Sequence, residues 1–188
     1  GLYVAIAAFH TEMLPTSFLL SIATARTGIV IPVALEVLLM EFQFELLKEA
    51  GIHLPGQLGG TIGIVGGLIV GQAAVEAGIV STIVVIVVSF TAIASFIVPN
   101  ESFGAVFRLL KFLFIVTAAI WGIYGYLLTF AALLLHLSQI ESFGVPYMLP
   151  SVCGENLNYD DKKDHYVRYP FAYMKKRPVF TREGRRIR

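Results

Sequence analysis

The chain has 188 residues, of which 56% are hydrophobic and 14% are charged, and its mean hydropathy is +0.76. Soluble domains carry about 25% charged residues and need less apolar surface, so this composition excludes an ordinary water-soluble protein. The formal net charge is only +1, but ten of the fourteen Lys and Arg residues lie between Lys162 and Arg188.

The N-terminal segment predicts the end of a membrane span. Gly1 to Phe9 starts within an apolar run, with no initiator Met, basic stretch or cleavage site, so we expect a fragment whose upstream part is missing. His10 to Thr16 interrupts the apolar pattern, and Ser17 to Ala25 is apolar but too short to cross a membrane alone. Pro32 then fixes the turn before the next element.

Val33 to Ala50 is the clearest amphipathic helix that the sequence predicts, and we expect Gly51 to end it as a C-cap. Its carboxylates Glu41, Glu45 and Glu49 are four residues apart and therefore share one face. In a symmetric oligomer they would form rings that attract cations in an acidic vestibule. In a monomer they would form a solvated helix face, and both interpretations stay open.

Leu58 to Val75 predicts a glycine-rich membrane helix. One face repeats glycine every fourth residue, at Gly59, Gly63, Gly67 and Gly71. In lipid such a face lets another helix approach closely. The opposite face carries polar ends around an aliphatic middle, at Thr61, Val65, Leu68, Gln72 and Glu76. This stripe suits a pore-lining helix with a hydrophobic constriction, or polar side chains that bond a neighbouring helix with Glu76 in a loop.

Two more helical spans are predicted, at Thr82 to Val98 and at Phe103 to Leu135. The first is rich in Ile and Val, but an open strand in a bilayer leaves its amides unpaired, which favours a helix. Ala77 to Val98 and Phe112 to Leu135 run for twenty-two and twenty-four residues without a charge, long enough for a bilayer core of about 30 Å. The predicted fold class is therefore all-α, a polytopic helical membrane protein.

The basic residues predict the orientation of the chain. After residue 150 the sequence is polar and lacks apolar periodicity, so we expect a transmembrane helical domain at residues 1–150 and a largely irregular basic tail at 151–188. Basic residues that follow a last span are retained in the cytoplasm, which predicts a cytoplasmic tail. Arg108 and Lys111 oppose this rule, and we expect their long side chains to reach the membrane interface. For the tail, contact with anionic lipid or solvent is favoured over nucleic acid.

No catalytic pattern is visible in the sequence. The four histidines, at positions 10, 53, 136 and 165, lack the spacing of metal ligands, and no phosphate-binding loop, nucleophile elbow or dinucleotide fingerprint occurs. We therefore expect neither an enzyme nor a bound metal or cofactor.

Several strings occur in a distinctive order. They are ALEVLLMEFQFELLKEAGIHLP after Arg26 to Pro32, then TIGIVGGLIVGQAAVEAGIVS, VIVVSFTAIASFIVP, RLLKF and SFGVPYMLP, and a tail with Asp164, Arg168, Pro170, Met174, Arg177 and Pro178. In this order the chain resembles the A subunits of GerA-type spore germinant receptors over nearly its whole length. It departs from the family at Ile29 to Pro32, which reads IVIP where the family often has VPFP.

The resemblance implies a protein of the inner spore membrane of an endospore-forming bacterium. It implies a transporter-like B subunit and a lipoprotein C subunit as partners, and a homo-oligomer that forms a nutrient-gated ion channel. Family A subunits carry a soluble region before the membrane part, in keeping with the expected fragment. Two alternatives stay open: a non-conducting scaffold subunit of the receptor, and a fragment of a permease that resembles a secondary transporter.

Overall fold

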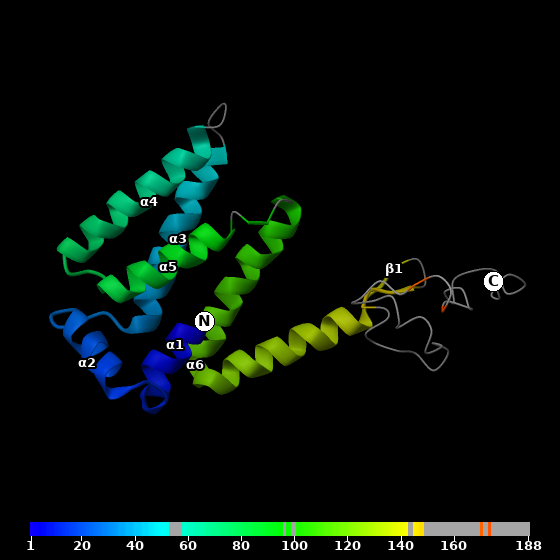
Figure 1. The fold of residues 1–188 in the computed structure, drawn as a ribbon, viewed down its shortest axis with the longest axis horizontal. Coiled ribbons are helices and arrows are strands. Elements are labelled where there is room, and N and C mark those ends of the chain that lie inside the picture. The colour runs from blue at the N-terminus through cyan, green and yellow to red at the C-terminus, as the bar shows by residue number, and fades with distance from the viewer. Residues whose placement is uncertain are drawn as a thin grey trace, which may run out of the picture. The chain divides into compact units, whose positions relative to one another are not determined.

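A computed structural model describes residues 1–52, 58–95, 97–98, 101–142, 145–148, 170 and 173, and these are mostly helical (Figure 1). The elements are α1 (Leu2–Phe9), the 3₁₀ turn η1 (Thr11–Met13), α2 (Thr16–Ala25), α3 (Val33–Ile52), α4 (Leu58–Glu76), α5 (Thr82–Ser95), α6 (Glu101–Gln139), β1 (Glu141–Ser142) and β2 (Val145–Pro146). The two short strands pair antiparallel. Gly1–Thr129 and Phe130–Arg188 form two compact units. Nearly all of the predicted basic tail lies outside the described residues.

The predicted long helices are present, with some differences at their ends. α5 ends at Ser95, three residues before the predicted end, and α6 extends beyond its predicted span at both ends. The predicted C-cap at Gly51 is wrong, because Gly51 is buried inside α3, which continues to Ile52. A glycine within a helix costs only about 1 kcal/mol relative to alanine, so tertiary contacts can carry the helix past it.

Helix α6 bends at Gly122, a feature that the sequence analysis did not predict (Figure 1). The backbone there has φ 61° and ψ −138°, which separates two helical segments. This conformation is essentially restricted to glycine. A Cβ at Gly122 would lie 3.0 Å from both Phe9 Cβ and His10 Cε1, so the end of α1 packs against the bend.

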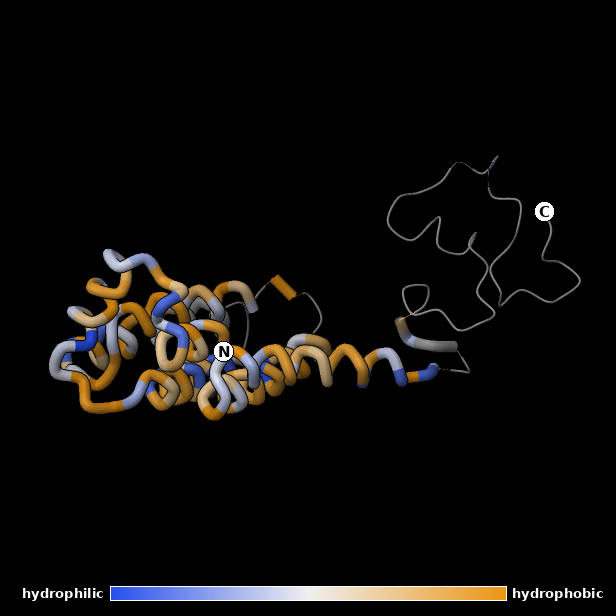
Figure 2. Tube along the Cα trace, turned by 90° about the horizontal axis from the view of Figure 1, so that it is seen from below, coloured by the Kyte–Doolittle hydropathy of each residue, from blue (hydrophilic) through white to orange (hydrophobic). Residues whose placement is uncertain are grey.

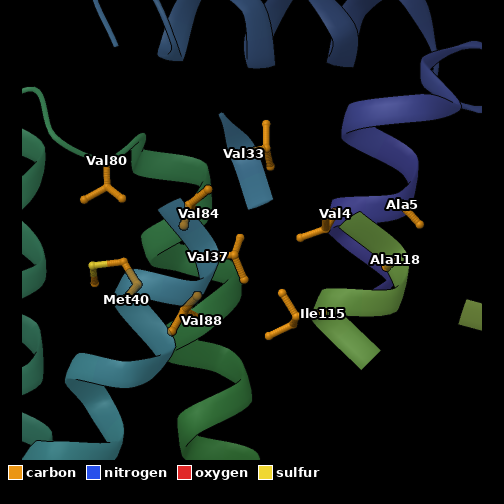
Figure 3. Packing of buried hydrophobic residues seen from close by; sticks show 10 residues of the cluster. All are labelled: Val4, Ala5, Val33, Val37, Met40, Val80, Val84, Val88, Ile115 and Ala118. Carbon is orange, nitrogen blue, oxygen red and sulfur yellow. The ribbon is translucent and has the colours of Figure 1, made fainter. Parts of the chain in front are cut away.

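The core of the first unit is built around α3, which contacts α1, α4 and α5. Figure 3 shows side chains from α1, α3, α5 and α6, with Val80 from the turn before α5, gathered in this core. The buried hydrophobic residues are Val4, Ala5, Val33, Val37, Met40, Val80, Val84, Val88, Ile115 and Ala118. Burial of these side chains holds α3 in place between its neighbours.

The polarity of α3 is reversed relative to a helix on the surface of a soluble protein. Its carboxylates Glu36 and Glu41 are buried, whereas Leu39, Phe42 and Leu46 on the same helix are exposed. Other helices of this unit also expose large apolar side chains, and Figure 2 shows hydrophobic residues along most of the described helices. Extended exposed apolar surface marks contact with a membrane or another protein.

One helix in the described part of the chain is long and apolar enough to cross a membrane, judged by length and composition. It is Phe103–Gln139, and only 11% of its apolar window is buried inside the structure. The helices Thr16–Ala25 and Thr82–Ser95 and the segment Val65–Glu76 are apolar but shorter.

Candidate functional site

Helix α4 contacts its neighbours through the glycines of its repeat. A Cβ at Gly67 would overlap the Phe44 ring of α3, and a Cβ at Gly63 would lie 3.5 Å from a backbone carbonyl oxygen of α3. At Gly71 it would lie 3.1 Å from a Val85 methyl group of α5. The glycine face of α4 is therefore filled by other helices, and at Gly67 no space remains for a side chain.

The opposite side of α4 carries the α4 stripe, which we define as Val65, Leu68, Gln72 and Glu76. Val65 is 49% exposed and Leu68 is 63% exposed, and the Gln72 amide donates a hydrogen bond to Glu76 Oε1 at 3.2 Å. Glu76 is the last residue of α4 rather than part of a loop. Gly59 and Thr61, also predicted as site residues, belong to the first turns of α4. What surrounds them lies outside the part of the chain that the structure describes.

The three predicted carboxylates of α3 pair with two basic residues of α6, and we call this set the α3–α6 charge ladder. Lys111 Nζ lies 2.6 Å from Glu41 Oε2 and 3.0 Å from Glu45 Oε2. Arg108 Nη1 lies 3.1 Å from Glu45 Oε1 and 3.6 Å from Glu49 Oε2. Each basic side chain thus bridges two carboxylates, and the order of the pairs shows that the two helices run antiparallel here.

The charge ladder is graded in burial. The side chain of Glu41 is 4% exposed, that of Glu45 is 22% exposed and that of Glu49 is 58% exposed. Breaking a buried ion pair leaves an unpaired charge out of water, which costs far more than loss of a surface pair. The Glu41 end therefore contributes most to holding the helices together.

A second buried charge centre lies at Glu36, which is fully buried in α3. Its Oε2 accepts a hydrogen bond from the Ser81 backbone N–H at 2.9 Å, at the start of α5. Its Oε1 lies 3.0 Å from Arg26 Nη2, which also donates to the Ile31 carbonyl oxygen at 2.9 Å. This centre joins the segment before α3 to the turn between α4 and α5.

Neither set of charge contacts was predicted from the sequence. The three carboxylates were expected on one face of α3, but Arg108 and Lys111 were expected to reach the membrane interface, whereas both are paired with α3 and mostly buried. Glu36 was not singled out, although a carboxylate and Arg26 in such an apolar chain are signals of a buried pair. Among the described residues, no group of three or more His, Cys, Asp and Glu could hold a metal ion.

Comparison with known proteins decides the family. The family model described as Bacillus/Clostridium GerA spore germination protein matches residues 1–180. The chain belongs to the GerA family. The resemblance inferred from the sequence motifs is thereby confirmed.

Three relatives illustrate this GerA membership. The chain is 42% identical over 180 residues to the spore germination protein GerLA of Bacillus cereus, covering 96% of this chain and 36% of that protein. It is 46% identical over 161 residues to the spore germination protein A1 of Bacillus subtilis, covering 86% and 33%. It is 43% identical over 178 residues to the uncharacterized membrane protein YfkQ of Bacillus subtilis, covering 95% and 34%.

This GerA chain spans about a third of the length of the curated relatives it matches. No solved structure matches it. The family links the chain to spore germination, and its glycine face, α4 stripe and charge ladder lie in the segment that these relatives share.

Proposed function

We propose that this GerA-family chain is a membrane subunit of a nutrient germinant receptor, and that several copies form a nutrient-gated ion channel lined by the α4 stripe. The observation that carries the proposal is the two-sided character of α4. Its glycine face is filled by α3 and α5, whereas Val65 and Leu68 are 49% and 63% exposed within the part of the chain that the structure describes. A second copy or a water-filled path can therefore meet the stripe without displacing the core.

The reversed polarity of α3 supports insertion in a membrane. A bilayer favours charged groups that pair inside a bundle and apolar groups that face outward. Glu41 and Phe42 are consecutive residues of α3 that follow this pattern, because the Glu41 carboxylate is paired with Lys111 and the Phe42 ring is exposed. We propose that α4, α5 and α6 span the inner spore membrane and that the basic tail is cytoplasmic. The receptor partners would be a transporter-like B subunit and a lipoprotein C subunit.

Conduction through such a path would be controlled by its aliphatic part. Val65 and Leu68 are followed along the stripe by Gln72 and Glu76, which are hydrogen-bonded to each other. A ring of aliphatic side chains narrows a pore and excludes water, so it blocks ions until the ring widens. The proposed gate is therefore the Val65 and Leu68 layer, with polar groups after it.

The gate is tested by substitution in the full receptor. We expect Leu68→Ser and Val65→Ala to raise ion release from spores in the absence of nutrient, because a more polar or wider ring admits water. Ile86→Ser is the matched control, since Ile86 is 62% exposed on α5 and lies outside the stripe. If both stripe variants assemble normally and release ions only with nutrient, the stripe is a packing surface and the non-conducting scaffold is favoured.

The acidic vestibule is a separate part of the proposal. Glu49 is the most exposed carboxylate of the charge ladder, with 58% of its side chain accessible. We expect Glu49→Gln to lower the cation conductance of the open receptor in low salt, because the carboxylate raises the local cation concentration. Single-channel or liposome flux measurements at two ionic strengths test this, with Glu12→Gln as the control at an exposed carboxylate outside the ladder. Equal conductance in both variants would contradict the vestibule.

A further inference from the structure

We propose that the α3–α6 charge ladder holds the α4 stripe in its closed position, so that Lys111 and Arg108 are positioning residues of the gate. This inference rests on the proposed function. It adds a physical connection from α6 through α3 to the stripe. The ion pairs keep α6 fixed against α3, and the close packing of α3 on α4 transmits any displacement of α3 to the stripe.

The first step is the link between α6 and α3. The Lys111 ammonium group bridges Glu41 and Glu45 at 2.6 and 3.0 Å, and Glu41 is almost fully buried. Both bases reach across from α6 to one row of carboxylates, so movement of α6 along or away from α3 stretches every pair at once. Partly buried pairs resist such movement because separation leaves charges poorly solvated.

The second step is the link between α3 and α4. Phe44 lies between Glu41 and Glu45 in the sequence of α3, and its ring fills the space over Gly67. Because a Cβ at Gly67 would overlap that ring, α3 and α4 are in close contact at this point. Leu68 of the stripe directly follows Gly67, so a displacement of α3 at the ladder reaches the proposed gate within one helical turn.

The third step is the effect of release. With the ladder formed, Glu41 and Glu45 are occupied by Lys111. When the bases leave, Glu41 and Glu45 lose the ammonium group that bridges them, and the two carboxylates, four residues apart on α3, repel each other. The ladder therefore has a paired arrangement and a self-repelling arrangement, which gives α3 a reason to shift when α6 moves.

Substitutions at Lys111 test the ladder in the assembled receptor. Lys111→Gln removes the bridge, Lys111→Arg keeps the charge, and the exchange Glu41→Lys with Lys111→Glu restores an ion pair with reversed polarity. We expect nutrient-independent ion release to rise between about 5-fold and 150-fold in Lys111→Gln, the usual range of coupling between sites. Lys111→Arg should match the unsubstituted receptor. The exchange should recover part of the closed behaviour, because it restores the pair with position 41 but places a carboxylate near Glu45.

A distance measurement separates this inference from the channel proposal. Cys153 is the only cysteine in these 188 residues. With Cys153 and any cysteine elsewhere in the full-length protein replaced by serine, spin labels can be placed at Leu46 of α3 and Leu109 of α6, which are both exposed. We expect Lys111→Gln to lengthen or broaden the distance between these labels, and Lys111→Arg to leave it unchanged. This readout does not depend on ion flow.

The outcomes divide cleanly. Unchanged distances in Lys111→Gln, or changed distances with normal nutrient-dependent ion release, would overturn the inference. If Lys111→Gln fails to assemble, Arg108→Gln gives the same test at the more exposed end of the ladder. If the unsubstituted receptor conducts no ions while the distances change as expected, the channel proposal fails and the ladder remains a hold between α3 and α6.

Discussion

Space, rather than backbone conformation, requires glycine at position 67. Gly67 is helical, so alanine would suit its backbone and raise helix propensity by about 1 kcal/mol. The Phe44 ring nevertheless fills the volume that a side chain would occupy. At Gly66, one residue earlier, an added Cβ would lie 3.5 Å from Leu47 Cδ2, an ordinary van der Waals contact. Substituting alanine at both positions therefore distinguishes the effect of packing, present only at Gly67, from the gain in helix propensity, present at both.

We expect Gly67→Ala to destabilise the folded protein by about 1–3 kcal/mol, because overpacking forces the Phe44 ring or α4 to move. Gly66→Ala should be neutral or slightly stabilising. Thermal unfolding of the detergent-solubilised protein and its level in the membrane measure the difference. Equal stability of the two variants would show that the α3–α4 contact is looser than the structure indicates.

At Glu36 the charge of the side chain, rather than the space it occupies, is what the structure requires. Arg26→Met would leave this buried carboxylate without its positive partner, which we expect to lower the free energy of unfolding by about 3–5 kcal/mol. Glu36→Gln keeps an oxygen acceptor for the Ser81 N–H and should cost less than Glu36→Ala. A set of unfolding midpoints for these variants checks the order. If Arg26→Met left the unfolding midpoint unchanged, the ion pair with Arg26 would not be needed to stabilise the buried Glu36.

At the scale of elements, α6 is the helix whose shape depends most on one residue. A straight helix of 39 residues would be about 58 Å long, well beyond a bilayer core of about 30 Å. The bend at Gly122 interrupts it where Phe9 and His10 of α1 pack closely. The His10 ring also contacts Tyr124 just after the bend, with ring centroids 6.0 Å apart. The bend is therefore part of the α1 contact.

Gly122→Ala should destabilise the folded protein by about 1–3 kcal/mol or straighten α6, since alanine strongly disfavours this backbone conformation and its Cβ would crowd α1. Gly104→Ala is the matched control on α6, because nothing lies within 4 Å of its Cβ position. Distances between labels on the two halves of α6 and unfolding midpoints would detect either effect. If Gly122→Ala behaves as Gly104→Ala does, the bend is not needed for the fold.

At the scale of the whole molecule, the first unit buries the carboxylates Glu36 and Glu41 and exposes many large apolar side chains. In water such a surface would drive aggregation, whereas in lipid it requires no further covering. The described surface of α3, α5 and the first half of α6 has this character, with Phe42, Phe90 and Leu109 exposed. The same arrangement predicts which positions reagents in water can reach.

Single cysteines in a Cys153→Ser background test the membrane arrangement with a membrane-impermeant maleimide. We expect Phe42→Cys, Phe90→Cys and Leu109→Cys to react slowly in membranes, because the proposed arrangement places these positions against lipid. Ser151→Cys should react only when the cytoplasmic side is opened. Fast labelling of the first three from water would contradict embedding, and labelling of Ser151→Cys from outside intact cells would reverse the predicted orientation.

The sequence by itself determined the family, the positions of the long helices and the two faces of α4. These follow from local spacing, since a membrane segment satisfies its backbone groups as a helix and a helical period puts Gly63 and Gly67 opposite Val65 and Leu68. The motif order carries the family resemblance, and the family match confirms it.

Only the tertiary structure decided what each face meets. Glu41 and Lys111 are 70 residues apart, so no local pattern could pair them, and the same carboxylate row fitted a solvated face equally well. Gly51 and Gly122 show the same limit, because one continues a helix and the other bends one. Spacing along the chain sets which side chains share a face, but the approach of distant helices sets whether that face is filled, charged against a partner or open.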